Sequence, residues 1–325
     1  MKTPSLGIDI AKLTFDAALR FDRQRCLKAR FANNRSGFQQ LYRWLKTHCA
    51  AGSALRVAVE STSTYAEALV EWLDAKRCCV FLLNPERVAH YGRCCGQRNH
   101  TDSADAALLA AFIAQHDDLT PWQPPPPEQK DLRSLTRARA QVVATTTSLQ
   151  LQVQTATGPA RPHLQALLQA ARRTLALLGQ AITAQLKAHA HLWAQARRLM
   201  TIKGLGLITA AVMVAELPPI TAATDPRTIC AWCGLTPRRS QSGPREWTTR
   251  LSRKGNAYLR QALYMPALVA KRYNPLLRAF AQRLAQNGKS NGAILGALSH
   301  KMLRIAVGLL RSQQDFDPNW HLPKI

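Results

Sequence analysis

The sequence predicts an α/β domain at the N-terminal end, followed by long helices and a strongly basic C-terminal region. Up to residue 113, patterns typical of strands and helices follow one another in an α/β order. Four consecutive prolines at 124–127 then end that order, and the excess of basic over acidic side chains grows towards the C-terminus. We expect three parts, divided at these changes: residues 1–127, 128–196 and 197–325.

The first part is expected to contain five strands, with helices after the third, fourth and fifth. Turn-like residues 22–24 separate the second strand from the third, and Ser36 is a plausible N-cap for the first helix. The pair Asn84-Pro85 ends the fifth strand, and Thr101 opens the last helix. The strands are expected at 5–10, 15–21, 26–32, 55–60 and 78–83, and the helices at 36–48, at 65–75 and from 101 onwards.

The proline run predicts an extended connector, since stacked prolines exclude helix. A long helical stretch follows it and is broken at Gly158-Pro159 and Pro162. Its second half has apolar residues at alternating four- and three-residue steps, which predicts a coiled-coil seam. Two helices joined at 158–162 indicate an antiparallel hairpin, which could be half of a helical bundle or a dimerisation arm. The seam residues are Leu164, Leu168, Ala171, Leu175, Leu178 and Ile182.

The charge points to a polyanionic partner. The chain has 325 residues with 44 Lys and Arg against 19 Asp and Glu, a net charge of +25. Residues 1–130 carry 17 basic and 13 acidic side chains, 131–196 carry 7 and 1, and 197–325 carry 20 and 5, so the nets are +4, +6 and +15. Such an excess favours phosphate backbones, although charge alone does not separate DNA, RNA and anionic membranes.

The sequence contains no signal-peptide pattern and no uninterrupted apolar stretch long enough to span a membrane. We therefore expect a cytoplasmic protein without a membrane partner, and its eight cysteines should be reduced. Cys230 and Cys233 have the spacing of a redox motif or half a zinc site. Because no second such pair follows them, we expect both to be buried structural cysteines.

Four carboxylates fall at positions suited to metal binding. Asp9 lies between two isoleucines in an apolar strand, where burial of an unpaired carboxylate costs on the order of several kcal/mol. Glu60 ends the fourth strand, and Asp102 and Asp105 share a face in the first turn of a helix. Alone, Asp102 could simply interact with the helix dipole. Together, the four predict a site for hard divalent cations of the kind that act on phosphodiesters.

A basic segment in the C-terminal part predicts a phosphate site, although it could be a solvated loop. Residues 238–260 hold seven basic side chains opposed only by Glu246. Ser240, Ser242 and Ser252 lie among them, and each could attack phosphorus with guanidinium groups stabilising the charge. The seven are Arg238, Arg239, Arg245, Arg250, Arg253, Lys254 and Arg260.

Two further features have alternative interpretations. Residues 202–212, which include Lys203, resemble the turn of a helix-hairpin-helix module, so their glycines could serve DNA contact or simple helix packing. Tyr258 and Tyr264 could in principle act as tyrosine nucleophiles, but both fall at a spacing typical of a helix core.

Motifs along the chain resemble those of the DEDD transposases of insertion-sequence family 110, which includes pilin-gene invertases. The resemblance extends from residue 5 to about 310. In the first part it rests on Gly7-Ile-Asp-Ile-Ala-Lys12, Glu60-Ser-Thr-Ser-Thr-Tyr65, Asn84-Pro85 and Arg98-Asn-His-Thr-Asp-Ser-Ala-Asp-Ala106. In the last part it rests on Gly234-Leu-Thr-Pro-Arg238, Ser242-Gly243, Ser252-Arg-Lys-Gly-Asn256 and Leu259-Arg-Gln-Ala-Leu-Tyr-Met-Pro-Ala267.

The resemblance implies a fold and a catalytic site. The fold is an α/β RNase-H-like (RuvC-like) domain, followed by a helical coiled-coil hairpin and a mainly α-helical C-terminal transposase domain with a serine loop. Asp9, Glu60, Asp102 and Asp105 would be the Mg²⁺-binding tetrad, and Ser242 the nucleophile. The chain has Pro244 where the family often has a small polar residue.

The resemblance also implies a recombinase that cuts and rejoins donor and target DNA through a covalent serine–DNA link. It implies a homo-oligomer, dimer to tetramer, and guidance by a non-coding bridge RNA. One alternative is a RuvC-like Holliday-junction resolvase that uses water, with Ser242 structural. Another is a non-catalytic protein that binds nucleic acids.

Overall fold

The computed structural model describes residues 4–22, 24–49, 55–60, 64–97, 101–238, 241–242, 245–246 and 250–317. The chain divides into two compact units, Met1–Pro124 and Pro125–Ile325. This division falls inside the proline run that the sequence indicates as a connector. The expected division near residue 196 lies within the second unit and remains a prediction.

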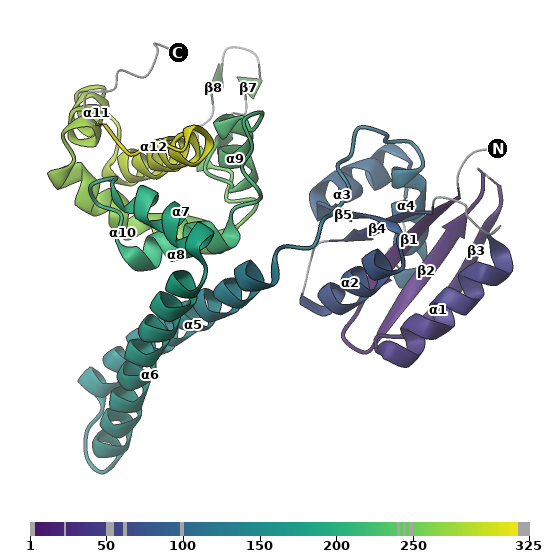
Figure 1. Ribbon diagram of the computed structural model, residues 1–325, viewed down its shortest axis with the longest axis horizontal. Coiled ribbons are helices and arrows are strands. Elements are labelled where there is room, and N and C mark those ends of the chain that lie inside the picture. The colour runs from purple at the N-terminus through teal and green to yellow at the C-terminus, as the bar shows by residue number, and fades with distance from the viewer. Residues whose placement is uncertain are drawn as a thin grey trace. The chain divides into compact units, whose positions relative to one another are not determined.

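The first unit is a five-stranded mixed sheet with helices on both faces (Figure 1). Its strand order is β3-β2-β1-β4-β5. The first three strands are antiparallel neighbours, whereas β4 and β5 run parallel to β1. The strands are β1 (Ser5–Ile10), β2 (Thr14–Arg20), β3 (Cys26–Ala32), β4 (Arg56–Glu60) and β5 (Cys79–Leu83). The helical segments are α1 (Arg35–His48), η1 (Thr64–Ala66), α2 (Glu67–Ala75), α3 (Pro85–Cys94) and α4 (Asp102–Ile113). The predicted α/β class is confirmed.

Alternation along the strands assigns each side chain to one of two faces. Leu6 and Ile8 of β1 pack with α1 and α2 in one apolar core. The intervening residues of β1 face α4, and Ala18 and Ala58 on the neighbouring strands pack with that helix or its surroundings. The α4 face is therefore the one that carries Asp9 and Glu60.

The structure differs from the sequence analysis at two places in this unit. The N-cap of α1 is Asn34 and not Ser36, because Asn34 has the extended backbone and its side chain accepts a hydrogen bond from the Gly37 N–H. The second concerns α3, which directly follows β5 and was not expected from the sequence. Asn84 caps this helix and Pro85 takes its first position, so the pair that ends the strand also begins a helix.

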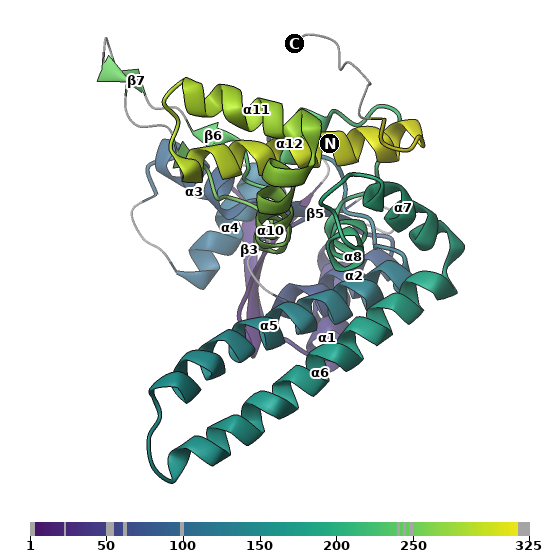
Figure 2. The same cartoon turned by 90° about the vertical axis from the view of Figure 1, so that its left-hand side faces the viewer.

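The helices of the second unit begin with a long antiparallel pair (Figure 2). In α6, Leu168 and Ile182 of the predicted seam are buried, whereas Leu167 and Leu177 outside it are 54% and 63% exposed. Pro162 lies in the first turn of α6, where proline is tolerated. The helices are α5 (Pro127–Thr155), α6 (Ala160–Ala188), α7 (Ala190–Met200), α8 (Leu207–Glu216), α9 (Pro226–Trp232), α10 (Ala257–Tyr273), α11 (Pro275–Gln286) and α12 (Asn291–Ser312).

The start of α5 is hydrogen-bonded to the end of α8. The Gln129 side chain donates to the carbonyls of Val214 and Leu217, and Arg133 Nε donates to that of Ala215. Val214 and Ala215 lie in the last turn of α8 and Leu217 is its C-cap, so the helix supplies no partner for these carbonyls. The two helices are thus joined by polar contacts as well as by packing.

The helix α12 is long and apolar enough to cross a membrane by length and composition. More than half of that apolar stretch, 56%, is buried. Its residues Leu298, Met302 and Ala306 are fully buried in the core of the second unit. This burial is typical of the core helix of a globular domain.

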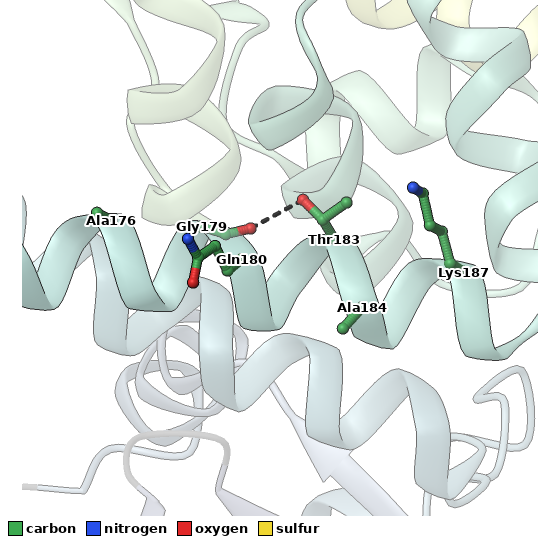
Figure 3. A pocket seen from close by; sticks show the side chains of 6 residues that line it. All are labelled: Ala176, Gly179, Gln180, Thr183, Ala184 and Lys187. Carbon is green, nitrogen blue, oxygen red and sulfur yellow. Dashed lines mark hydrogen bonds between the residues drawn. The ribbon is translucent and has the colours of Figure 1, made fainter.

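A hollow of about 500 Å³ lies along α6 (Figure 3). Thr183 Oγ1 donates to the Gly179 carbonyl there, and Lys187 is the one charged residue among the described residues of the lining. The lining is otherwise small or polar: Ala176, Gly179, Gln180, Thr183 and Ala184. No catalytic grouping arises from these side chains.

Candidate active site

The position of the acidic site follows from how closely α4 approaches β1. Ser5 Oγ donates to the Ala110 carbonyl at 3.0 Å. Two residues further along β1, a Cβ on Gly7 would clash with the Ala106 carbonyl. Two residues along a strand and four along a helix cover similar distances, about 6 to 7 Å. The same progression brings Asp9 beside Asp102 at the start of α4.

Polar residues form a row across the α4 face of the sheet. Asp9 pairs with Asp16 on β2, and Asp16 pairs with Arg30 on β3. On the other side, Glu60 ends β4 one residue after Val59, the partner of Ile8. The row therefore reads Arg30, Asp16, Asp9 and Glu60, with the first turn of α4 nearby.

The electrostatics show that the predicted carboxylates influence one another. Burial raises the pKa of Asp9 above 3.8, and the charges of Asp102, Asp105 and Asp16 raise it further. Burial also raises the pKa of Glu60 above 4.5, with Asp9 and Asp105 adding to the effect. Such mutual repulsion is what a bound cation would relieve.

Asp102 and Asp105 each accept a hydrogen bond from a neighbouring side chain. Asp102 Oδ2 accepts from Arg30 Nη2 at 2.8 Å, and Asp105 Oδ1 accepts from Gln97 Nε2 at 2.9 Å. Within the described part of the chain, no three Asp, Glu, His or Cys side chains are arranged as a metal-binding group. The donor chemistry fits a hard divalent cation, because all four side chains supply oxygen. The fold brings the four together without aligning them as ligands.

The predicted serine lies on a two-part β-ribbon. Its outer strands, β6 (Pro237–Arg238) and β9 (Arg250–Leu251), are antiparallel, as are its inner strands, β7 (Gln241–Ser242) and β8 (Arg245–Glu246). In these registers Ser242 is opposite Arg245, and Arg238 is opposite Arg250. The ribbon thus pairs the serine with one basic residue and two basic residues with each other.

The base of the ribbon is closely packed. A Cβ on Gly255 would clash with the Trp232 carbonyl, and one on Gly234, where φ is +71°, would clash with Lys254. Arg260 Nη1 donates to the carbonyls of Cys233 and Gly255. The predicted phosphate ligand Arg260 therefore holds the two ends of this segment together.

A buried carboxylate that the sequence analysis missed supports the same base. Glu216, only 3% exposed, accepts from Arg137 Nε at 2.7 Å and Nη2 at 2.9 Å, and from Asn256 Nδ2 at 2.7 Å. Asn256 also caps α10, directly after the ribbon. This cluster joins α5, α8 and the start of α10. Its only sequence signal is a lone acidic residue at the end of an apolar helix.

The structure describes the side chains of only some of the other predicted binding residues. Arg238, Arg253, Lys254 and Lys203 are exposed. Ser240 and Arg239 lie outside the described residues, and for Ser242, Arg245 and Arg250 only the backbone is described.

The structure also bears on the glycine turn near Lys203 and on Tyr264. Gly204 packs on α10, which favours helix packing over DNA contact at that glycine. Tyr264 is 52% exposed, so its expected core position is wrong. The buried face of α10 includes Leu259, Leu263 and Ala267, and Tyr264 points about 100° away from Leu263 around the helix.

The two cysteines of the C-terminal pair are buried, as expected. Burial raises the pKa of both Cys230 and Cys233 to about 12. Their thiols are therefore neutral at physiological pH, which disfavours nucleophilic or redox roles.

Comparison with known proteins gives matches over most of the chain. A family model for IS110-type DEDD proteins, described as "Transposase", matches residues 6–157, and one described as "Transposase IS116/IS110/IS902 family" matches 196–282. The pilin gene-inverting proteins of Moraxella bovis and Moraxella lacunata are each 29% identical to this chain over 99% of its length and 100% of theirs. The transposase for insertion sequence element IS1328 of Yersinia enterocolitica is 32% identical over 34% of each chain.

With the carboxylate cluster of the α/β unit and the basic second unit, these matches define a transposase, an enzyme that recombines DNA. The chain belongs to the IS110 family of transposases.

Proposed function

We propose that the chain cuts and rejoins donor and target DNA at a composite site made of the acidic cluster and Ser242. The observation that carries this proposal is the gathering of Asp9, Glu60, Asp102 and Asp105 on one face of the sheet, where burial and repulsion raise the pKa of the first two. A divalent cation, Mg²⁺ in our proposal, would be held by these four carboxylates. When bound, it would supply Lewis-acid stabilisation of charge on the scissile phosphate.

Ser242 is the nucleophile in this proposal. Its Oγ forms a bond to phosphorus while the bond from phosphorus to one DNA strand breaks, and the serine proton ends on the released strand hydroxyl. The link keeps the phosphodiester energy, so the reverse attack by a strand hydroxyl rejoins DNA and frees the serine. Arg238, Arg245 and Arg250 in the ribbon registers support the assignment, because guanidinium groups stabilise negative phosphoryl oxygens.

The remaining parts of the proposal concern fold, partners and setting. We propose an RNase-H-like (RuvC-like) first domain over 1–127, which the strand order and directions support. A coiled-coil hairpin over 128–196 and a transposase domain over 197–325 would follow. The basic ribbon residues and Lys203 would contact nucleic acid. The protein would act in the cytoplasm as a dimer to tetramer, guided by a bridge RNA, with no membrane partner.

The test is to trap the covalent product on denaturing gels with Mg²⁺ present. The unaltered protein should give a protein–DNA adduct and Ser242→Ala should give none, while Ser252→Ala, changed in the same segment, should keep it. Asp9→Asn should also abolish the adduct. Free nicked ends from a fully active Ser242→Ala protein would contradict the serine mechanism and favour the resolvase that uses water.

A further inference from the structure

An arginine at the edge of the acidic cluster contacts two carboxylates at once. Arg30 Nε donates to Asp16 Oδ2 at 2.9 Å, and its Nη2 lies 2.7 Å from the same oxygen and 2.8 Å from Asp102 Oδ2. The Asp16 side chain is only 11% exposed, whereas that of Arg30 is 57% exposed. The Arg30 guanidinium, which Asp16 of the sheet holds in place, thus forms an ion pair with one carboxylate oxygen of Asp102.

Neither Arg30 nor Asp16 belongs to the four carboxylates assigned to metal, yet both lie in the same row across the sheet. The charge of Asp16 also contributes to the raised pKa of Asp9. Without Arg30, the carboxylates of Asp9, Asp16 and Asp102 would repel one another more strongly. Arg30 therefore balances charge where the cluster is most crowded.

We propose that Arg30 is a positioning residue, which pairs with Asp102 in the metal-free protein and releases it when a divalent cation binds. This inference rests on the proposed metal-binding role of the four carboxylates. Asp16 holds the guanidinium through Nε, so Arg30 stays beside the cluster after Asp102 turns away. Its charge stabilises the metal-free protein and opposes the entry of a second cation.

The test measures Mn²⁺ binding to the full chain by calorimetry, together with the melting temperature without metal. Arg30→Gln should bind Mn²⁺ about fivefold more tightly, the size expected for losing one exposed ion pair. It should also melt at a lower temperature without metal and recover most of that loss in excess Mn²⁺. Lys28→Gln is the matched control, since it removes the same charge from the same face of β3. Equal affinities for these two variants would overturn the inference.

A double-mutant cycle tests whether the effect acts through Asp102. In an Asp102→Asn background, Arg30→Gln should change Mn²⁺ affinity less than twofold, and an undiminished effect would overturn the inference. Asp16→Asn gives an independent test should Arg30→Gln fail to fold: it should weaken Mn²⁺ binding, because the guanidinium charge then acts without its partner. If the unaltered protein binds no Mn²⁺, the proposed metal role fails and this inference with it. Normal binding with no response to Arg30→Gln overturns the inference alone.

Discussion

At the scale of single residues, burial and mutual repulsion destabilise the charged forms of Asp9 and Glu60 in the acidic cluster. Asp9 and Glu60 have raised pKa values because they are partly buried and lie near other carboxylates. A carboxyl group with a raised pKa in the folded protein stabilises the fold when protonated. That stabilisation is complete below the unfolded pKa and is lost as the pH rises through the folded pKa. The metal-free protein should therefore lose stability as the pH rises from about 4 through the raised pKa values of these two groups.

Asp9→Asn should reduce this loss. In chelator, the variant should melt a few degrees higher than the unaltered protein at pH 7, because a desolvated charge is gone, and the difference should shrink towards pH 4. Melting temperatures at several pH values check this. Asp118→Asn, which changes a side chain that is 70% exposed, should show no such pH-dependent gain. A destabilised Asp9→Asn protein at pH 7 would contradict the account.

The sequence indicated which carboxylates gather but not which side chains surround them. Asp9 could be predicted because burying an aspartate between two isoleucines is unfavourable unless a partner stabilises its charge. The same argument applies to Asp16, which lies between Phe15 and Ala17. The position of Arg30 beside the cluster could not be predicted, because its contact with Asp16 depends on the pairing register of β2 and β3. Composition does not determine that register.

At the scale of elements, the contact of α4 with β1 places the site. Gly7, with Ala18 and Ala58 on the adjacent strands, leaves room for the helix to lie close to the sheet. The positions of Asp102 and Asp105 relative to Asp9 depend on this close contact.

Gly7→Ala should destabilise the protein by about 3 kcal/mol, since a buried methyl group would overlap helix backbone that has no room to move. Urea unfolding measures the change. Gly179→Ala is the matched control: nothing lies within 4 Å of the added Cβ. As a glycine inside a helix, it should gain about 0.5 to 1 kcal/mol on this change. A stable Gly7→Ala protein would mean that α4 is not held as closely as described.

The Glu216 cluster is a second contact between elements whose contribution to the free energy of unfolding can be measured. Glu216→Gln should cost about 2 to 3 kcal/mol, because Arg137 would lose its charged partner and the Asn256 contact would change. Asp131→Asn on the exposed face of α5 should change the free energy of unfolding by less than about 0.5 kcal/mol. Similar values for the two variants would show that the buried carboxylate contributes little.

The elements themselves were largely predictable, because strand and helix periodicities are local. The five strands of the sheet were placed to within one residue at each end, whereas α3 was missed. Asn84-Pro85 is an equally good end for a strand and beginning for a helix, and local sequence does not separate the two. The β-ribbon was expected only as a loop, since its strands of two residues have no detectable period.

At the scale of the whole molecule, the charge determines how the protein binds DNA, and the division into two units determines where it can be divided. Residues 197–325 carry 20 basic and 5 acidic side chains, a net of +15. Binding to duplex DNA should therefore weaken steeply with salt, as counterions released from phosphates are the main driving force.

Removing one phosphate contact should lower the slope of log K against log salt by about 0.9. Arg253→Gln and Lys254→Gln, at exposed positions beside the ribbon, should each do so in full-chain binding titrations. Arg43→Gln, on the exposed face of α1, should leave the slope unchanged. Unchanged slopes for the ribbon variants would place the DNA elsewhere on the protein.

The hydrogen bonds from α5 to the end of α8 have a consequence for protein engineering. A chimaera that takes residues up to 196 from one relative and the remainder from another would have to match Gln129 and Arg133 to a foreign helix end. A crossover between Pro124 and Pro125 keeps both sides of these α5–α8 contacts in one parent, since it follows the boundary between the two units. Exchange of the first unit between relatives is best attempted at that junction, with the long hairpin left attached to the helices that it supports.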